Sequence, residues 1–191
     1  MEYKNDLTRQ LIEYKPYNEQ EERDREAILA LLSSDVVDPY ARENLTAHMT
    51  ASAWIVNSER TKVLMVYHNL YDSWSWTGGH ADGERNMLYV ALKEVREETG
   101  VEHIRPVSDE IFSVECLTVD GHEKRGQYVP SHIHMNVTYL LEADEKDMLH
   151  ICEGENSGVK WFTLDEVLKA SSEPWFVERI YKKLNEKLLG L

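Results

Sequence analysis

Three glutamates, Glu94, Glu97 and Glu98, are spaced so that their side chains share one face of a helix. Like charges at these offsets repel one another and lower helix stability unless a cation neutralises them. Gly78 and Gly79 precede this segment, and glycine lets a backbone approach a ligand closely. Carboxylates beside a glycine turn suit a hard divalent cation such as Mg²⁺, which keeps water and substrate phosphates in its shell. A solvated, charged helix face is the alternative for such a cluster taken alone.

The surrounding segment, GGHADGERNMLYVALKEVREETGV at residues 78–101, resembles the Nudix box, whose family pattern is G-x5-E-x7-R-E-U-x-E-E-x-G-U with U aliphatic. The positions that match are Gly79, Glu94, Val95, Glu97, Glu98, Gly100 and Val101. Two positions depart, because Arg85 replaces the first glutamate and Lys93 replaces the arginine. In the family these two residues brace the loop against the helix. Lysine keeps the charge but loses the planar fork, and Glu84 is a candidate substitute for the missing glutamate.

The resemblance implies a MutT-like Nudix hydrolase that depends on Mg²⁺, or on Mn²⁺ in its place. Such an enzyme hydrolyses the diphosphate of a nucleoside diphosphate linked to another moiety. Glu94, Glu97 and Glu98 would then be metal ligands and catalytic residues. A bound metal neutralises charge on the diphosphate and lowers the pKa of a bound water. The products are a nucleoside monophosphate and the phosphorylated second moiety.

Further residues are expected to complete the site. Gly78, Gly79 and His80 form the cofactor-binding loop in this interpretation. Nudix enzymes often take one more carboxylate from the loop ahead of the last strand, and Glu155 has better spacing than Glu153 for that role. The proton of the attacking water would go to Glu155 or to Glu94. A solvated loop glutamate is the alternative for Glu155.

His132 and His134 alternate along a predicted strand, so their side chains share a face. They are interpreted either as a second pair of metal ligands or a proton shuttle, or as a polar, half-exposed strand face.

Two other functions are weighed. A catalytically silent Nudix module that binds a nucleotide as a sensor would typically lack a metal glutamate, and all three are present. Residues 78–80 also resemble isopentenyl-diphosphate isomerases, which share the fold and use that histidine on a metal. Those enzymes carry a catalytic cysteine where this chain has Gly78, so isomerase chemistry is disfavoured.

Composition limits the partners. The net charge of −14 argues against nucleic acid or an acidic membrane surface as a main partner, so a small nucleotide diphosphate is expected. The first residues, MEYKNDLTRQ, lack an apolar signal, and no apolar run reaches membrane-spanning length. With only two cysteines, a reducing cytoplasmic location is expected. Homodimers are common in the family, and a monomer is the alternative.

Hydrophobic periodicity and the positions of capping residues, glycine and proline predict the elements that position these residues. Residues 1–50 are expected to form a helical extension packed on the core, with Asn18 as a helix cap. Residues 51–191 are expected to form the Nudix domain, an α/β (α+β) protein built as an α/β/α sandwich with a mixed sheet. Expected strands are 51–57, 62–68, 74–77, 111–119, 132–141 and 159–162, with a mobile loop at 121–130. Expected helices run from Asn86 to Gly100, over 164–170, and from Pro174 with Trp175 facing inward.

Overall fold

The computed structural model describes residues 7–34, 38–124 and 126–191. Parts of the expected N-terminal extension (1–6 and 35–37) and one residue of the expected loop, Arg125, lie outside these ranges. The helices are α1 (Leu7–Glu13), α2 (Glu19–Leu32), α3 (Met87–Thr99), α4 (Leu164–Ala170), α5 (Pro174–Phe176), the π-helical η1 (Val177–Tyr181) and α6 (Lys182–Leu189). The strands are β1 (Ala47–Val56), β2 (Lys62–His68), β3 (Ser73–Ser75), β4 (Thr77–His80), β5 (Ile104–Pro106), β6 (Ser113–Val119), β7 (His122–Lys124), β8 (Gln127–Val129), β9 (His132–Ala143) and β10 (Asn156–Thr163).

The main sheet has eight strands and is mixed, as predicted. Its central order is β10-β2-β1-β9-β5, and β3, β4 and β6 pair with β2, β1 and β9 respectively. The long strands β1 and β9 run parallel, whereas the other pairs in this sheet are antiparallel. The parallel pair matters for the site, because it sets residues far apart in sequence side by side at the start of both strands.

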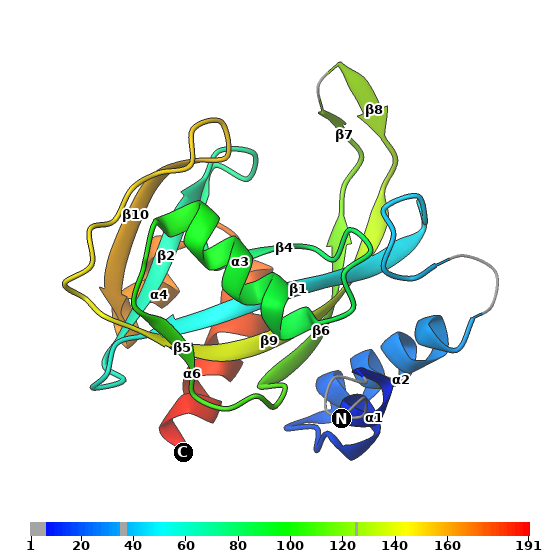
Figure 1. Ribbon diagram of the computed structural model, residues 1–191, viewed down its shortest axis with the longest axis horizontal. Coiled ribbons are helices and arrows are strands. Elements are labelled where there is room, and N and C mark those ends of the chain that lie inside the picture. Colours follow the sequence, from blue (N-terminus) through cyan, green and yellow to red (C-terminus); the bar gives the residue numbers. More distant parts are fainter. Residues whose placement is uncertain (1–6, 35–37, 125) are drawn as a thin grey trace.

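Two helical layers cover the sheet, which confirms the predicted sandwich. In Figure 1, α3 crosses in front of β1 and β9, whereas α6 lies behind the sheet. All ten residues of β1 are buried because the strand is covered on both faces. Alternate residues of β1 (Met49, Ala51, Ala53 and Ile55) share a hydrophobic cluster with α3, whereas Trp54 and Val56 share another with α6. The Trp54 ring stacks on Tyr181 with ring centroids 5.4 Å apart.

The helix of the Nudix-like segment begins and ends where the sequence predicts. Asn86 caps the N-terminus of α3 through its side chain, and Gly100 ends it with φ of 74°, a conformation that favours glycine. The apolar residues Met87, Leu88, Ala91, Leu92 and Val95 predict the inner face of this helix, and Met87, Ala91 and Val95 are buried there. Val90 is fully buried, whereas Leu88 and Leu92 are only partly buried at the margin of the cluster.

Three further predictions need correction. Strand β1 begins at Ala47 instead of residue 51. The expected mobile loop at 121–130 contains a β7–β8 hairpin, in which His122 pairs with Val129, and Figure 1 shows it projecting from the body of the protein. Trp175 is 50% exposed instead of inward, and the C-terminal segment is interrupted by the π-helical η1, whose Ile180 and Tyr181 are buried as predicted.

The two helices that precede β1 contact the rest of the protein. Asn18 caps α2, as predicted, by accepting a hydrogen bond from the backbone N–H of Glu21. Leu7, Leu11 and Ile28 belong to the same hydrophobic cluster as α3, and α1 and α2 lie beside β6 in Figure 1. The domain boundary at residue 50 stays a prediction. Among the described residues, no helix is long and apolar enough to cross a bilayer.

Candidate functional site

Gly78 and Gly79, which the sequence predicts as a turn, lie in strand β4 and contact two glutamates of α3. The backbone N–H of Gly78 donates a hydrogen bond to Glu98 Oε1 at 3.1 Å. A Cβ atom on Gly79 would lie 2.3 Å from Glu94 Cδ, so any side chain there would displace that carboxylate. The structure therefore brings the predicted glycines and two of the predicted glutamates together.

The carboxylates of this cluster differ in their exposure and electrostatics. Glu98 is only 6% exposed, and burial, reinforced by the charges of Glu94 and Glu155, raises its pKa to about 8. Burial also raises the pKa of Glu94, although Lys93 opposes the effect. Glu97 is more exposed, with 52% of its side chain accessible. A partly buried, mutually repelling set of oxygen donors fits the requirements of a hard divalent cation, which would relieve the repulsion.

Lys93, at the box position where the family has arginine, lies over the same carboxylates. Its Nζ is 3.0 Å from Glu94 Oε1 and 3.1 Å from Glu97 Oε2. The ammonium therefore neutralises part of the cluster. These contacts are to glutamates of its own helix, which differs from the loop brace that the resemblance implies for this position.

Arg85, the other departure from the box, faces the segment before β1. Its guanidinium contacts Asp38 Oδ2 at 3.1 Å and lies over the Tyr40 ring, 4.7 Å from the centroid. Glu84 accepts hydrogen bonds from the backbone N–H groups of Arg85 and Asn86, both at 2.8 Å. The loop is thus tied to the preceding segment by Arg85, and Glu84 caps the residues that lead into α3.

Glu155 is electrostatically coupled to the box glutamates, although it lies some 60 residues later in the chain. Its charge raises the pKa of both Glu94 and Glu98. The neighbouring Asn156 is buried, and its side-chain amide donates to the backbone oxygen of Glu98 at 2.9 Å. This bond fastens the loop ahead of β10 to the end of α3 and keeps Glu155 near the cluster.

The predicted histidines lie on the other face of β4. Because adjacent residues of a strand point to opposite faces, His80 points away from the face on which Gly79 packs against Glu94. There His80 meets His132 and His134, and a fourth histidine, His48, which the sequence analysis missed. His48 is brought in by the parallel pairing of β1 with β9, in which it is the direct register partner of His134. No local sequence pattern marks that pairing.

An open cavity of about 530 Å³ lies elsewhere, where the end of β9 meets β5. Its lining includes His103, Arg105 and Glu142, and none of the predicted site residues. The predicted site residues of the Nudix-like segment therefore lie outside this cavity.

Comparison with known proteins agrees with the predicted resemblance. Several solved structures of hydrolases have a similar fold at low sequence identity, whereas no curated protein matches the sequence. A NUDIX-family hydrolase from Clostridium perfringens has a TM-score of 0.53 at 19% identity, covering 74% of this chain and 95% of the other. A NUDIX hydrolase from Nitrosomonas europaea has a TM-score of 0.53 at 17% identity, covering 74% and 88%. A C. elegans Ap4A hydrolase has a TM-score of 0.51 at 17% identity, covering 75% and 98%. These likenesses establish the fold, and the family model for the NUDIX domain matches residues 46–184, so the chain belongs to the NUDIX domain family, as its box predicts.

Proposed function

We propose that this protein hydrolyses a diphosphate bond in a nucleoside diphosphate linked to another moiety, with Mg²⁺ as its metal and Mn²⁺ as a substitute. The observation that carries the proposal is the buried Glu98, which is held by the Gly78 N–H and crowded by the charges of Glu94 and Glu155. Such repulsion is unfavourable in a purely structural site, and a cation that binds phosphate oxygens would relieve it.

Glu94, Glu97 and Glu98 are the proposed metal ligands, and their carboxylate oxygens match the preference of Mg²⁺. When bound, the metal supplies charge neutralisation on the diphosphate and a lowered pKa for water. Gly78 orients the Glu98 carboxylate through its N–H, and Gly79 leaves room for Glu94. The protein side of the site is therefore preorganised by backbone geometry.

Glu155 is the proposed general base, with Glu94 as the alternative. The water oxygen forms a new bond to phosphorus while the bridging phosphorus–oxygen bond breaks. The water proton passes to the carboxylate, and the departing phosphate keeps the electron pair of the broken bond. The loop that carries Glu155 is fixed to α3 through Asn156, which keeps the acceptor within the same charged cluster.

The first expected result is turnover that requires a divalent metal. Purified protein incubated with Mg²⁺ and a panel containing ADP-ribose, a dinucleoside tetraphosphate and an oxidised nucleoside triphosphate should release phosphorylated products from at least one substrate. Removal of the metal with a chelator should abolish the release, and added Mn²⁺ should restore it. Product analysis by ion-exchange chromatography would show which bond is broken. Tight nucleotide binding by calorimetry, with no product from any compound, would instead favour the silent sensor.

The second expected result distinguishes the role of Glu155 from that of Glu153, its neighbour in the same exposed loop. Glu155→Gln should lower turnover by roughly 10²–10⁴-fold if the carboxylate accepts the water proton. Glu153→Gln is the matched control, because Glu153 lies two residues away in the same exposed loop, and its turnover should stay close to that of the unmodified protein. Equal rates for the two variants would assign the base to Glu94 instead.

Isomerase chemistry receives no support from the site. Gly78 occupies the position at which the isomerases carry their catalytic cysteine. The two cysteines of this chain, Cys116 and Cys152, are free thiols, and Cys116 lies in β6 with its Sγ 3.5 Å from Met135 Sδ. The expected cytoplasmic location, the lack of nucleic-acid partners and the homodimer stay predictions.

A further inference from the structure

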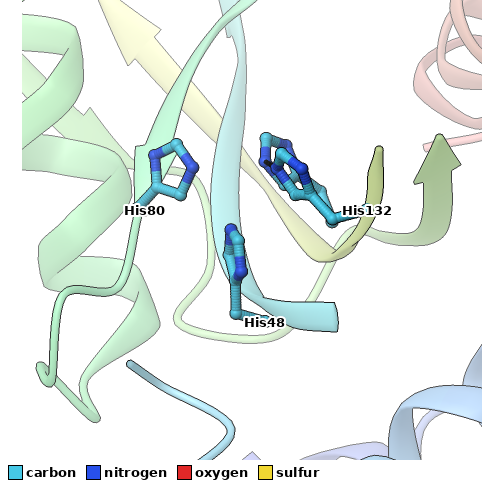
Figure 2. Close-up of side chains that lie close together, drawn as sticks. His48, His80 and His132 are labelled. Carbon is cyan, nitrogen blue, oxygen red and sulfur yellow. Dashed lines mark hydrogen bonds between the residues drawn. The ribbon is translucent and has the colours of Figure 1, made fainter. Parts of the chain in front are cut away.

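Four histidines converge on one point at the start of β1 and β9 and at the end of β4. One side-chain nitrogen from each of His48, His80, His132 and His134 lies within 4.8 Å of the others. Figure 2 shows the rings of His48, His80 and His132 directed toward a common space from three different strands. Five pairs of rings among these four histidines have their centroids 4.7–5.2 Å apart.

The sheet register places all four imidazoles on one face. His48 and His134 are direct partners in the parallel β1–β9 pair, and His132 lies two residues before His134 on the same face. His80 pairs with Thr50, which lies two residues after His48. The convergence is therefore a property of the backbone, and it does not depend on a single flexible side chain.

Two of the rings are oriented by backbone carbonyls behind them. His48 Nδ1 lies 3.0 Å from the Asn44 carbonyl oxygen, and His132 Nδ1 lies 2.8 Å from the Pro130 carbonyl oxygen. A carbonyl can only accept, so each Nδ1 carries the proton, and in the neutral ring Nε2 presents a lone pair toward the cluster. This arrangement is typical of histidines that bind a metal, whose second nitrogen is fixed by an outer partner.

Among the described residues, one nitrogen on the inner side of the cluster has no hydrogen-bond partner. His48 is 4% exposed, and its Nε2 has no hydrogen-bond partner among the described residues. A buried polar atom without a partner is costly, and such atoms are rare in folded proteins. The Nε2 atoms of His132 and His134 are 3.1 Å apart, close to the roughly 3.3 Å that separates two nitrogens bound at about 2.0–2.1 Å to one tetrahedral ion.

The kind of donor atom indicates which ion the cluster would bind, because all four side chains are imidazoles. Four neutral nitrogen donors without a carboxylate do not suit Mg²⁺, which prefers oxygen ligands. Imidazole suits borderline ions such as Zn²⁺.

We propose that His48, His80, His132 and His134 bind a divalent transition-metal ion of the Zn²⁺ class, at a site distinct from the Mg²⁺ site of the glutamates. The two sites lie on opposite faces of β4, because His80 and Gly79 point in opposite directions. With four protein ligands the site is closed, as structural zinc sites are. The ion joins β4 to the starts of β1 and β9 and so stabilises the strand whose glycines contact Glu94 and Glu98 of α3. The proposal does not rest on the hydrolase function.

A direct test measures metal content and coordination, without any activity assay. The purified full chain is stripped with a chelator and dialysed against equimolar Zn²⁺ and Mg²⁺. Elemental analysis should find about one Zn²⁺ per chain. Co²⁺ in place of Zn²⁺ should give the strong visible absorption of a tetrahedral site, and Zn²⁺ should raise the unfolding temperature. Zinc content near zero, or a Co²⁺ spectrum typical of octahedral oxygen ligands, would overturn the proposal.

Variants locate the ion. His48→Gln and His134→Gln should each lower Zn²⁺ affinity by roughly a hundredfold or more, since loss of a ligand should exceed the 10–100-fold cost of losing an outer partner. His122→Gln is the matched control, because its ring centroid is 6.4 Å from that of His132 but it is outside the four. Glu98→Gln should keep its Zn²⁺. If one histidine variant fails to fold, as judged by circular dichroism, the other variant still tests the assignment. Unchanged affinity in the folded variants, or loss of Zn²⁺ in Glu98→Gln, would contradict the assignment.

Discussion

Replacing Glu98 with glutamine is expected to lower Mg²⁺-dependent turnover by about a hundredfold or more, equivalent to about 3 kcal/mol of transition-state stabilisation. The amide has nearly the same shape, and its oxygen can still accept the hydrogen bond from Gly78 N–H. The variant therefore removes the charge and leaves the packing. Steady-state kinetics on the best substrate of the panel, at saturating Mg²⁺, would measure the effect.

The same substitution is not expected to destabilise the metal-free protein. Glu98 is buried beside the charges of Glu94 and Glu155, and this environment raises its pKa to about 8. Above that pH the carboxylate is ionised and repelled by its neighbours, so a neutral amide should keep or increase the free energy of unfolding. Loss of turnover without loss of stability would separate a role in catalysis from a role in folding.

Glu102→Gln provides the matched control for that experiment. Glu102 is exposed and lies just beyond the end of α3, so its replacement should change neither turnover nor stability. Undiminished turnover in Glu98→Gln would remove Glu98 from the proposed metal ligands. A comparable loss in both variants would point to a general effect of charge on an acidic protein, whose net charge is −14.

Local signals in the sequence predicted the element that carries the box. Asn86 and Gly100 mark the ends of α3, and both ends are confirmed. The predicted strand at Lys62–His68 is also confirmed, because it has a continuous run of strand-forming residues between turn residues. These features depend on neighbours within one turn or one strand, which is the range over which sequence patterns are informative.

The structural features that the sequence did not predict depend on contacts between segments that are distant in the chain. His48 reaches the histidine cluster because β1 pairs in parallel with β9, some 86 residues away, and the sequence contains no local sign of that register. Similarly, the link between Glu155 and the box runs through Asn156, which bonds to the end of α3. The C-terminal segment is likewise interrupted by the π-helical η1, in which Ile180 and Tyr181 are buried whereas Trp175 before it is exposed.

A buried ionic cluster joins the N-terminal helices to the C-terminal helix. Lys183 of α6 is 4% exposed, and its Nζ lies 3.0 Å from Glu115 Oε1 of β6 and 3.3 Å from Glu21 Oε1 of α2. Both glutamates are fully buried. Burial acts to raise the pKa of Glu21, but Lys183 and Lys187 outweigh it, and the net pKa lies below its ordinary value. The favourable charges therefore dominate within the folded cluster.

Lys183→Met is expected to lower the free energy of unfolding by about 3–5 kcal/mol, the cost of leaving a buried charge without its partner. Glu21 keeps Lys187, whose Nζ is 2.8 Å away, but Glu115 loses the cation beside it. Adding Glu115→Gln should recover much of the loss, because the amide oxygen can still accept from Thr138, as the carboxylate does at 2.8 Å. Urea denaturation followed by circular dichroism would give the three free energies.

The neighbouring Lys182 supplies the control for this cluster. Lys182 is half-exposed and pairs with Glu178 one turn earlier, so Lys182→Met should change the free energy of unfolding by less than about 0.5 kcal/mol. Because both variants exchange lysine for methionine in the same helix, helix propensity and net charge change equally. A similar small effect in Lys183→Met would mean that the cluster contributes no net stability. A large loss that Glu115→Gln relieves would show that α6 is held to β6 by a paired charge, and that the cost arises from the unpaired carboxylate of Glu115.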